Sequence, residues 1–295
     1  MNVIRADVLG MCFGVRDALK VIASVDAPET VTIHGQLVHN EVVLDDLHTR
    51  GFRMLDEKER AVDRVSTPAV LITAHGISDR ERERLRVADR TVIDTTCPLV
   101  RRAHLAAKTL QSEGYHVLII GTRGHVEVQG IVEDLTSCEV VGSLDEVRSY
   151  EGPRLGVIAQ TTTPVARAAE IVRAIEQHNP HCEVRFVDTI CQPTKDHQRS
   201  LDRLLESVQA MVVVGGSNSN NTRALTEKCR AYGCPVIQVA SAEELDLDFL
   251  AGFERVGLTA GTSTLDRTID EVEHALKRHR PERLPVSSEG KVVAE

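Results

Sequence analysis

The chain lacks tryptophan, and its aromatic residues amount to only 3%. This composition excludes the base-stacking platforms with which many proteins hold single-stranded DNA or RNA. Basic residues do not dominate either, since 35 Lys and Arg stand against 44 Asp and Glu, for a net charge of −9. No basic cluster stands out along the sequence, so we expect no nucleic-acid partner.

Long hydrophobic runs are also missing. No apolar stretch approaches the roughly 18 residues that a membrane-spanning helix needs, and residues 1–7 lack the apolar core of a secretory signal. We therefore expect a cytoplasmic protein without a membrane partner. Because the seven cysteines are an odd number and disulfides are rare in a reducing compartment, some of these thiols are candidates for metal binding instead.

The 295 residues, 42% of them hydrophobic, are enough for about two packed domains, with three smaller ones allowed. An internal repeat favours three. Val92-Ile-Asp-Thr-Thr-Cys97 recurs 94 residues later as Phe186-Val-Asp-Thr-Ile-Cys191, and an apolar strand that ends in glycine closes 24 residues after each cysteine. A weaker third copy begins at Cys12.

The repeat divides the chain into α/β units with small, mostly parallel sheets. In each unit short apolar strands alternate with helical patterns, which indicates sheets covered on both faces. Ligands bind at the carboxyl ends of parallel strands, so units packed around a threefold axis would share one central pocket. Capping boxes that begin at Ser143 and Ser241 predict a second helix in the last two units. The expected boundaries are residues 1–96 for the first unit, with the N-terminal strand and Cys12, then 97–190, 191–279 and a tail over 280–295.

Cys12, Cys97 and Cys191, the cysteine trio, are the strongest candidates for metal ligands. Chance packing would not place a thiol at the same point of three units, whereas the other four cysteines are interpreted as core residues. Three thiolates suit a zinc ion with water as fourth ligand, or a cubane iron–sulfur cluster with one iron left free. We favour the cluster, because a free iron can bind a substrate oxygen and the cluster can deliver electrons.

Polar loops follow the predicted strand ends, and each precedes a helical pattern. Helix N-termini expose N–H groups and partial positive charge, which suits a diphosphate. Glu127 is an exception, because a carboxylate in an anion site is costly unless it carries or supplies a proton, and it is therefore a candidate general acid. The other loop residues are His39, His75, His125, Thr161, Thr162, Ser219, Asn220, Asn221 and Ser263.

From about residue 3 to 276 the chain resembles the 4-hydroxy-3-methylbut-2-enyl diphosphate reductase family. Three positions depart from the family pattern: Val126 stands for Pro, Asn220 for Ser, and Gln192-Pro-Thr-Lys follows Cys191 in place of a Tyr-Ala-Thr type run. The motifs that carry the resemblance are Gly10-Met-Cys12-Phe-Gly-Val15, Val38-His39-Asn40, Ala74-His75-Gly76, Thr96-Cys97-Pro98, Gly124-His125-Val-Glu127, Gln160-Thr161-Thr162, Thr189-Ile-Cys191, Asn218-Ser219 with Asn221, and Thr259-Ala-Gly-Thr-Ser263.

The resemblance implies a cloverleaf of three α/β domains around a 4Fe-4S cluster that the cysteine trio holds, with one iron free of protein ligands. It implies proton handling by Glu127 and Thr161 beside His125, and electrons from ferredoxin or flavodoxin. The implied reaction is reductive dehydroxylation to isopentenyl and dimethylallyl diphosphate, the last step of the non-mevalonate pathway. The implied diphosphate contacts are His39, His75, His125, Ser219, Asn221 and Ser263, with Thr162 and Asn220 as second contacts.

Two other functions stay open at this point. A non-catalytic iron–sulfur sensor could use the same cysteine trio without a diphosphate pocket. A zinc hydrolase that acts on a phosphorylated metabolite would bind one zinc ion and no sulfide. Neither explains why the anion loops and the thiols recur together, so we favour the reductase.

Overall fold

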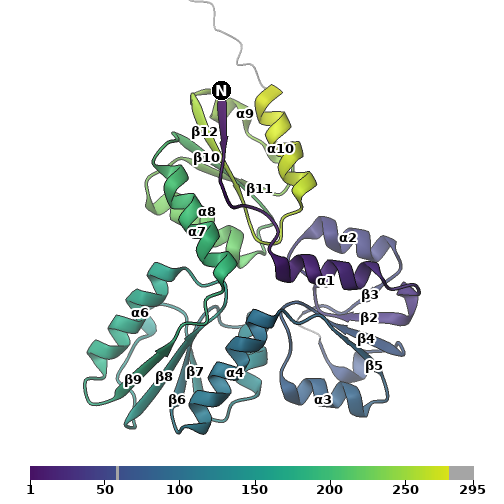
Figure 1. Ribbon diagram of the computed structural model, residues 1–295, viewed down its shortest axis with the longest axis vertical. Helices are drawn as coiled ribbons and strands as arrows, with labels where there is room; N and C mark the ends of the chain where they lie inside the picture. The colour runs from purple at the N-terminus through teal and green to yellow at the C-terminus, as the bar shows by residue number, and fades with distance from the viewer. Residues whose placement is uncertain (58–59, 279–295) are drawn as a thin grey trace, which may run out of the picture.

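The computed structural model describes residues 1–57 and 60–278, so the predicted tail over 280–295 lies outside the described residues. Within them the strands form three parallel, four-stranded sheets in three lobes (Figure 1). The α/β fold class is confirmed. The first sheet, in the order β3-β2-β4-β5, contains β2 (Val31–His34), β3 (Arg53–Met54), β4 (Ala69–Ile72) and β5 (Thr91–Asp94). The second, β7-β6-β8-β9, contains β6 (His116–Ile120), β7 (Cys138–Val141), β8 (Arg154–Ala159) and β9 (Glu183–Val187).

The third sheet has the order β1-β12-β10-β11 and draws its edge strand from the start of the chain. Here β1 (Asn2–Arg5) pairs in parallel with β12, with Val3 opposite Val256. The prediction that the N-terminal strand belongs to the first unit is therefore wrong. The first two units end in a strand that precedes the next cysteine, whereas the third ends in a helix, so the edge of β12 is left for β1 to cover. The other strands are β10 (Ala210–Val214), β11 (Val236–Val239) and β12 (Arg255–Ala260).

A helix begins directly after each member of the cysteine trio: α1 (Phe13–Ala23), α4 (Pro98–Ser112) and α7 (Gln192–Leu205). Each of these helices leaves the edge strand of one sheet and packs on the next sheet. Ala107 of α4, for example, lies in a core with Ile119 of β6, although β5, which leads into α4, belongs to the first sheet. The starts of these helices lie near the centre of the molecule (Figure 1), so each cysteine, which directly precedes one of them, lies where two units meet.

The remaining helices cover the sheets from both sides. Where capping boxes predict a second helix, the chain forms only single 3-10 turns, Leu144–Glu146 and Ala242–Glu244. Within the described residues no helix has the length and apolar character to cross a membrane. Two further 3-10 turns span Pro28–Thr30 and Val62–Arg64, and the other helices are α2 (Glu41–Thr49), α3 (Asp79–Val87), α5 (Val126–Glu133), α6 (Val165–His178), α8 (Asn220–Ala231), α9 (Leu247–Ala251) and α10 (Asp266–Arg278).

Candidate active site

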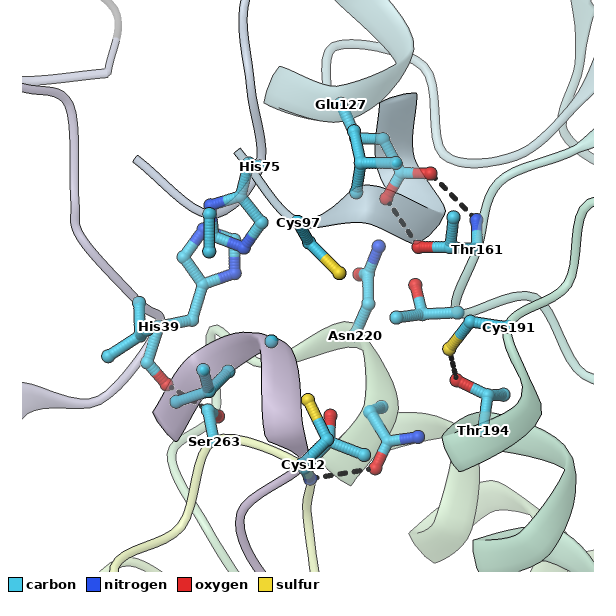
Figure 2. A pocket seen from close by; sticks show the side chains of 18 of the residues that line it. Cys12, His39, His75, Cys97, Glu127, Thr161, Cys191, Thr194, Asn220 and Ser263 are labelled. Atoms are coloured by element: carbon cyan, nitrogen blue, oxygen red, sulfur yellow. Dashed lines mark hydrogen bonds between the residues drawn. The ribbon is translucent and has the colours of Figure 1, made fainter. Parts of the chain in front are cut away.

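The cysteine trio lines a single cavity of about 90 Å³ (Figure 2). Cys12, Cys97 and Cys191 are the N-cap residues of α1, α4 and α7, so three helix N-termini meet here. Burial raises the pKa of each thiol, that of Cys191 to about 11. The free thiols are therefore protonated near neutral pH, and a metal would have to displace their protons to bind.

The spacing of the thiols fits a polynuclear group better than a single metal ion. The three sulfur atoms do not all lie within 4.8 Å of one another, whereas a tetrahedral zinc ion with Zn–S bonds of about 2.3 Å needs sulfur atoms about 3.8 Å apart. Gly14 gives the Cys97 sulfur its place in the cavity wall, because a Cβ added at Gly14 would lie 2.6 Å from Cys97 Sγ. The donor set and its surroundings therefore fit an iron–sulfur cluster.

Three histidines, His39, His75 and His125, form the opposite wall of the cavity and are called here the histidine trio. Their ring centroids lie 4.4 to 5.6 Å apart, and they come from the loops after β2, β4 and β6. Burial lowers the pKa of His75 far below its ordinary value and that of His125 to about 3, and the charge of His39 adds to both shifts. The neutral imidazoles of His75 and His125 can each donate one N–H to an anion.

Ligand nitrogens of the histidine trio lie within 4.8 Å of one another, which also suits a metal ion. Neighbouring groups favour an anion instead. Ser219 is the N-cap of α8, and its hydroxyl lies 3.5 Å from that of Ser263. The Asn221 Oδ1 atom accepts the N–H of Thr262 at 3.0 Å, and its buried Nδ2 has no partner in the described residues. Unpaired buried donors such as this one require an acceptor, which an anion provides.

Asn220 lies differently from the other predicted contacts. Its Nδ2 donates to Thr122 Oγ1 at 3.4 Å, and its Oδ1 accepts from Arg223. It lines the cavity together with Thr162, whose hydroxyl accepts from Gln160 at 3.2 Å. The Asn220 amide therefore joins the second and third units at the edge of the cavity.

Glu127 is buried in the cavity wall beside Thr161 (Figure 2). One carboxylate oxygen accepts the backbone N–H of Thr161 at 2.7 Å, and the other accepts its hydroxyl at 2.8 Å. Burial raises the pKa of Glu127 to about 7, although both hydrogen bonds from Thr161 lower it. His125 Nδ1 accepts the backbone N–H of Glu127 at 3.2 Å, which ties the Glu127 backbone to the histidine trio. The pair can hold and transfer a proton near neutral pH.

Sequence reasoning missed two residues of this site. Thr194 is fully buried, lines the cavity, and places Oγ1 3.1 Å from Cys191 Sγ. A Cys-x-x-Thr run at a helix start puts both side chains on one face, so the signal was present. The Glu57 Oε1 atom lies 3.1 Å from Nε2 of His39 and fixes this imidazole. No motif in the sequence points to Glu57.

Comparison with known proteins assigns the chain to a known family. A family model described as LytB protein matches residues 3–277. The 4-hydroxy-3-methylbut-2-enyl diphosphate reductase of Geobacter sulfurreducens is 35% identical over 276 residues, which cover 92% of this chain and 95% of that protein. The reductase of the same name from Dehalococcoides mccartyi is 34% identical over 286 residues, 94% of this chain and 98% of that protein.

Two solved structures of reductases are also similar to this chain. The E-1-hydroxy-2-methyl-but-2-enyl-4-diphosphate reductase of Plasmodium falciparum has a TM-score of 0.86 at 25% identity, covering 95% of this chain and 89% of that one. A second structure, described as (E)-4-hydroxy-3-methyl-but-2-enyl diphosphate reductase, the terminal enzyme of the non-mevalonate pathway, has a TM-score of 0.65 at 31% identity, with coverages of 94% and 99%. The chain therefore belongs to the LytB protein family.

Proposed function

We propose that the protein catalyses the reductive dehydroxylation of 4-hydroxy-3-methylbut-2-enyl diphosphate. The allylic C–O bond breaks, and two electrons with two protons give water and either isopentenyl or dimethylallyl diphosphate. One observation carries the proposal: a thiol set suited to a redox cofactor, a donor-rich anion site and a buried acid all line the same cavity. The predicted cytoplasmic location stays a prediction.

The cysteine trio would hold a 4Fe-4S cluster. When bound, such a cluster supplies electrons one at a time and, with three thiolates for four irons, leaves one coordination position free of protein. Thr194 would donate its hydroxyl to the Cys191 sulfur and so stabilise it as a thiolate. The three helix N-termini add positive potential around the thiolates.

The histidine trio, Ser219, Asn221 and Ser263 would hold the diphosphate. Among the described residues that line the cavity there is no Lys or Arg, so recognition depends on N–H and O–H donors and on the N-terminus of α8. Fixing the diphosphate at this wall orients the five-carbon chain toward the thiols. Thr162 and Asn220, at the cavity edge, would make second contacts.

Glu127 and Thr161 would supply the proton that converts the leaving hydroxyl into water. A pKa near 7 leaves a large share of the carboxyl protonated at neutral pH. The Thr161 hydroxyl, which donates to the carboxyl in the free protein, can turn toward the substrate and relay the proton. His125 would contact the diphosphate and hold the Glu127 backbone in place.

The decisive experiment is an anaerobic reconstitution followed by counts of iron and sulfide and by an assay of turnover with a chemical reductant. We expect about four irons and four sulfides per chain, conversion of the allylic diphosphate, and loss of both on changing any one of the cysteine trio to Ser. Changing Cys138 to Ser serves as a control, since it lies in β7, outside the cavity. One zinc without sulfide would support the hydrolase, and a full cluster without diphosphate binding would support the sensor.

A further inference from the structure

Glu57 places a carboxylate behind the wall that would hold the diphosphate. It follows β3 and does not itself line the cavity, but its Oε1 atom lies 3.1 Å from Nε2 of His39, which does. The pair is largely withdrawn from solvent, with 26% of the Glu57 side chain and 9% of the His39 side chain exposed. A carboxylate so close to an anion site would weaken binding by repulsion, unless it changes what His39 offers to the ligand.

The backbone of His39 is held in place independently of this contact. Its carbonyl accepts the Ser263 hydroxyl at 3.2 Å, and the side-chain amide of Asn40 donates to the Ser263 carbonyl at 2.8 Å. The imidazole itself has Glu57 as its one hydrogen-bond partner within the described residues. Glu57 therefore occupies Nε2 and leaves Nδ1 as the ring nitrogen that is available to a ligand.

Glu57 also determines where the hydrogen of His39 lies. Burial favours the neutral form of Glu57, but the hydrogen bond and the charge of His39 outweigh it, so the pKa of Glu57 lies below its ordinary value and the carboxylate is ionised. An ionised carboxylate can only accept, so Nε2 carries the hydrogen. A neutral His39 would then present a bare lone pair at Nδ1, which repels a phosphate oxygen. To donate to a diphosphate, His39 must carry a second proton.

The other two members of the histidine trio are arranged as neutral donors. His125 Nδ1 accepts the backbone N–H of Glu127, which leaves the hydrogen of this ring on Nε2. Burial keeps both His75 and His125 neutral, as their lowered pKa values indicate. Within the described residues only His39 of the three contacts a carboxylate. Since the ring centroids lie 4.4 to 5.6 Å apart, a second imidazolium would be repelled, and the carboxylate selects the ring that takes the proton.

We propose that Glu57 is a positioning residue that holds His39 as an imidazolium with Nδ1–H available to the diphosphate. The inference rests on the proposed function and deepens it, since it assigns a charge to one of the three imidazoles that would bind the substrate. No Lys or Arg lines the described part of the cavity, so this imidazolium would supply the full positive charge that the wall otherwise lacks. Charge-assisted hydrogen bonds of this kind are about twice as strong as neutral ones.

Diphosphate binding should therefore be coupled to the proton of His39. While His39 is charged in the free protein, the ligand binds without bringing a proton to it. Once a higher pH has removed that proton, binding must restore it, so proton uptake per bound diphosphate increases as the pH rises. The charged and titratable groups around His39 are Glu57, His75, His125 and Arg60, and the charge of Arg60 acts against a proton on the trio. Glu57 counters Arg60 at His39.

Anaerobic calorimetry of the reconstituted protein with inorganic diphosphate tests the proposal, because this probe requires no turnover. The test variant is Glu57→Gln. The matched control is Glu41→Gln, which removes the same charge from an exposed residue outside the cavity, two positions after His39. Simple repulsion predicts that the loss of either carboxylate strengthens diphosphate binding. We expect instead that Glu57→Gln raises Kd by at least about tenfold, whereas Glu41→Gln leaves Kd unchanged or lowers it.

The proton uptake is measured by repeating the titration in buffers of different ionisation enthalpy and at several pH values. The proton exchange of the diphosphate itself is common to all variants, so differences between variants report on His39. We expect the uptake of the wild type to increase with pH and that of Glu57→Gln to increase less. The single change His39→Gln must abolish the increase, which keeps the proposal testable if Glu57→Gln fails to fold.

A double variant separates the charge of Glu57 from any effect on the fold. In the His39→Gln background Glu57 is only a repelling charge, so the further change Glu57→Gln should no longer weaken binding. Equal or tighter binding by the single variant Glu57→Gln would overturn the inference and leave the proposed function standing. A loss of affinity that persists in the His39→Gln background would overturn it as well. If the wild type binds no diphosphate, the proposed function fails, and the inference fails with it.

Discussion

At the scale of single residues, the environment of Glu127 defines the chemistry of the cavity. Its carboxyl is 1% exposed and has only Thr161 as a side-chain partner within the described residues. Burial favours the neutral form, while the two hydrogen bonds favour the charged form. The balance leaves a group that can both hold and release a proton near pH 7.

The change Glu127→Gln keeps the size of this side chain and removes its proton. We expect kcat to fall by about 10²- to 10⁴-fold, with iron and sulfide content unchanged. In the wild type, kcat should decline as the pH rises through the Glu127 pKa of about 7, because the protonated form is the active one. Near-normal turnover of the variant would contradict the role of the acid.

The same pKa shift has a consequence for stability. A carboxyl whose pKa rises on folding binds protons more tightly in the native state, so native stability falls as the pH rises from about 4.5 to 7. The Gln variant has no carboxyl to titrate at this position, so it lacks this loss of stability. Its melting temperature should therefore exceed that of the wild type at pH 8, and the difference should shrink below pH 4.5.

At the scale of elements, most of the site is formed by residues at helix N-termini. Eight of its residues, the cysteine trio, His39, His125, Glu127, Ser219 and Asn221, lie at a helix start or just before one. This placement was predictable, since apolar strands followed by polar loops and helical patterns fix where the helix starts meet. The hydrogen bonds of individual side chains were not predictable. Asn220 forms hydrogen bonds with Thr122 of another unit and with Arg223 of its own helix, and no local sequence pattern specifies these partners.

The close approach of α1 to α4 gives a prediction at this scale. Gly14→Ala would place a methyl group 2.6 Å from Cys97 Sγ, so the sulfur would have to leave its position in the cavity wall. We expect loss of most cluster iron in an otherwise folded protein. Circular dichroism and the iron count check this, with Gly252→Ala as a control, since Gly252 has an ordinary φ of −72° at the end of α9 and its added Cβ would lie no closer than 3.9 Å to Phe249 O. A variant that retains its full cluster would show that the sulfur can move aside.

At the scale of the whole molecule, the chain is closed into a ring by β1. The repeat in the sequence predicted three units whose thiols meet. This was possible because nearly the same motif precedes Cys97 and Cys191. It did not predict that the strand before Cys12 joins the third sheet, since pairing between the two ends of a chain leaves no local signal. Counting strands would have helped: the third unit lacks its own strand beyond β12.

Two proline substitutions in β1 test the importance of this closure. Asn2 and Ala6 donate their N–H groups to Glu254 and Leu258, so by alternation the N–H of Ile4 faces β12 and that of Val3 faces away. Ile4→Pro should therefore destabilise the protein by at least about 1 kcal/mol more than Val3→Pro. Urea denaturation measures the difference. Equal losses would mean that the strand contributes through side-chain packing rather than through its ladder.

Closure by β1 also limits when the proposed cluster could be assembled in the cell. The Cys12 N–H donates to the carbonyl of Thr262 at 3.0 Å, a residue that the ribosome adds 250 positions later. Until Thr262 is added, the Cys12 backbone lacks this hydrogen bond. The proposed cluster would therefore assemble only after translation has passed Thr262, because a shorter product lacks the carbonyl that fixes the Cys12 backbone.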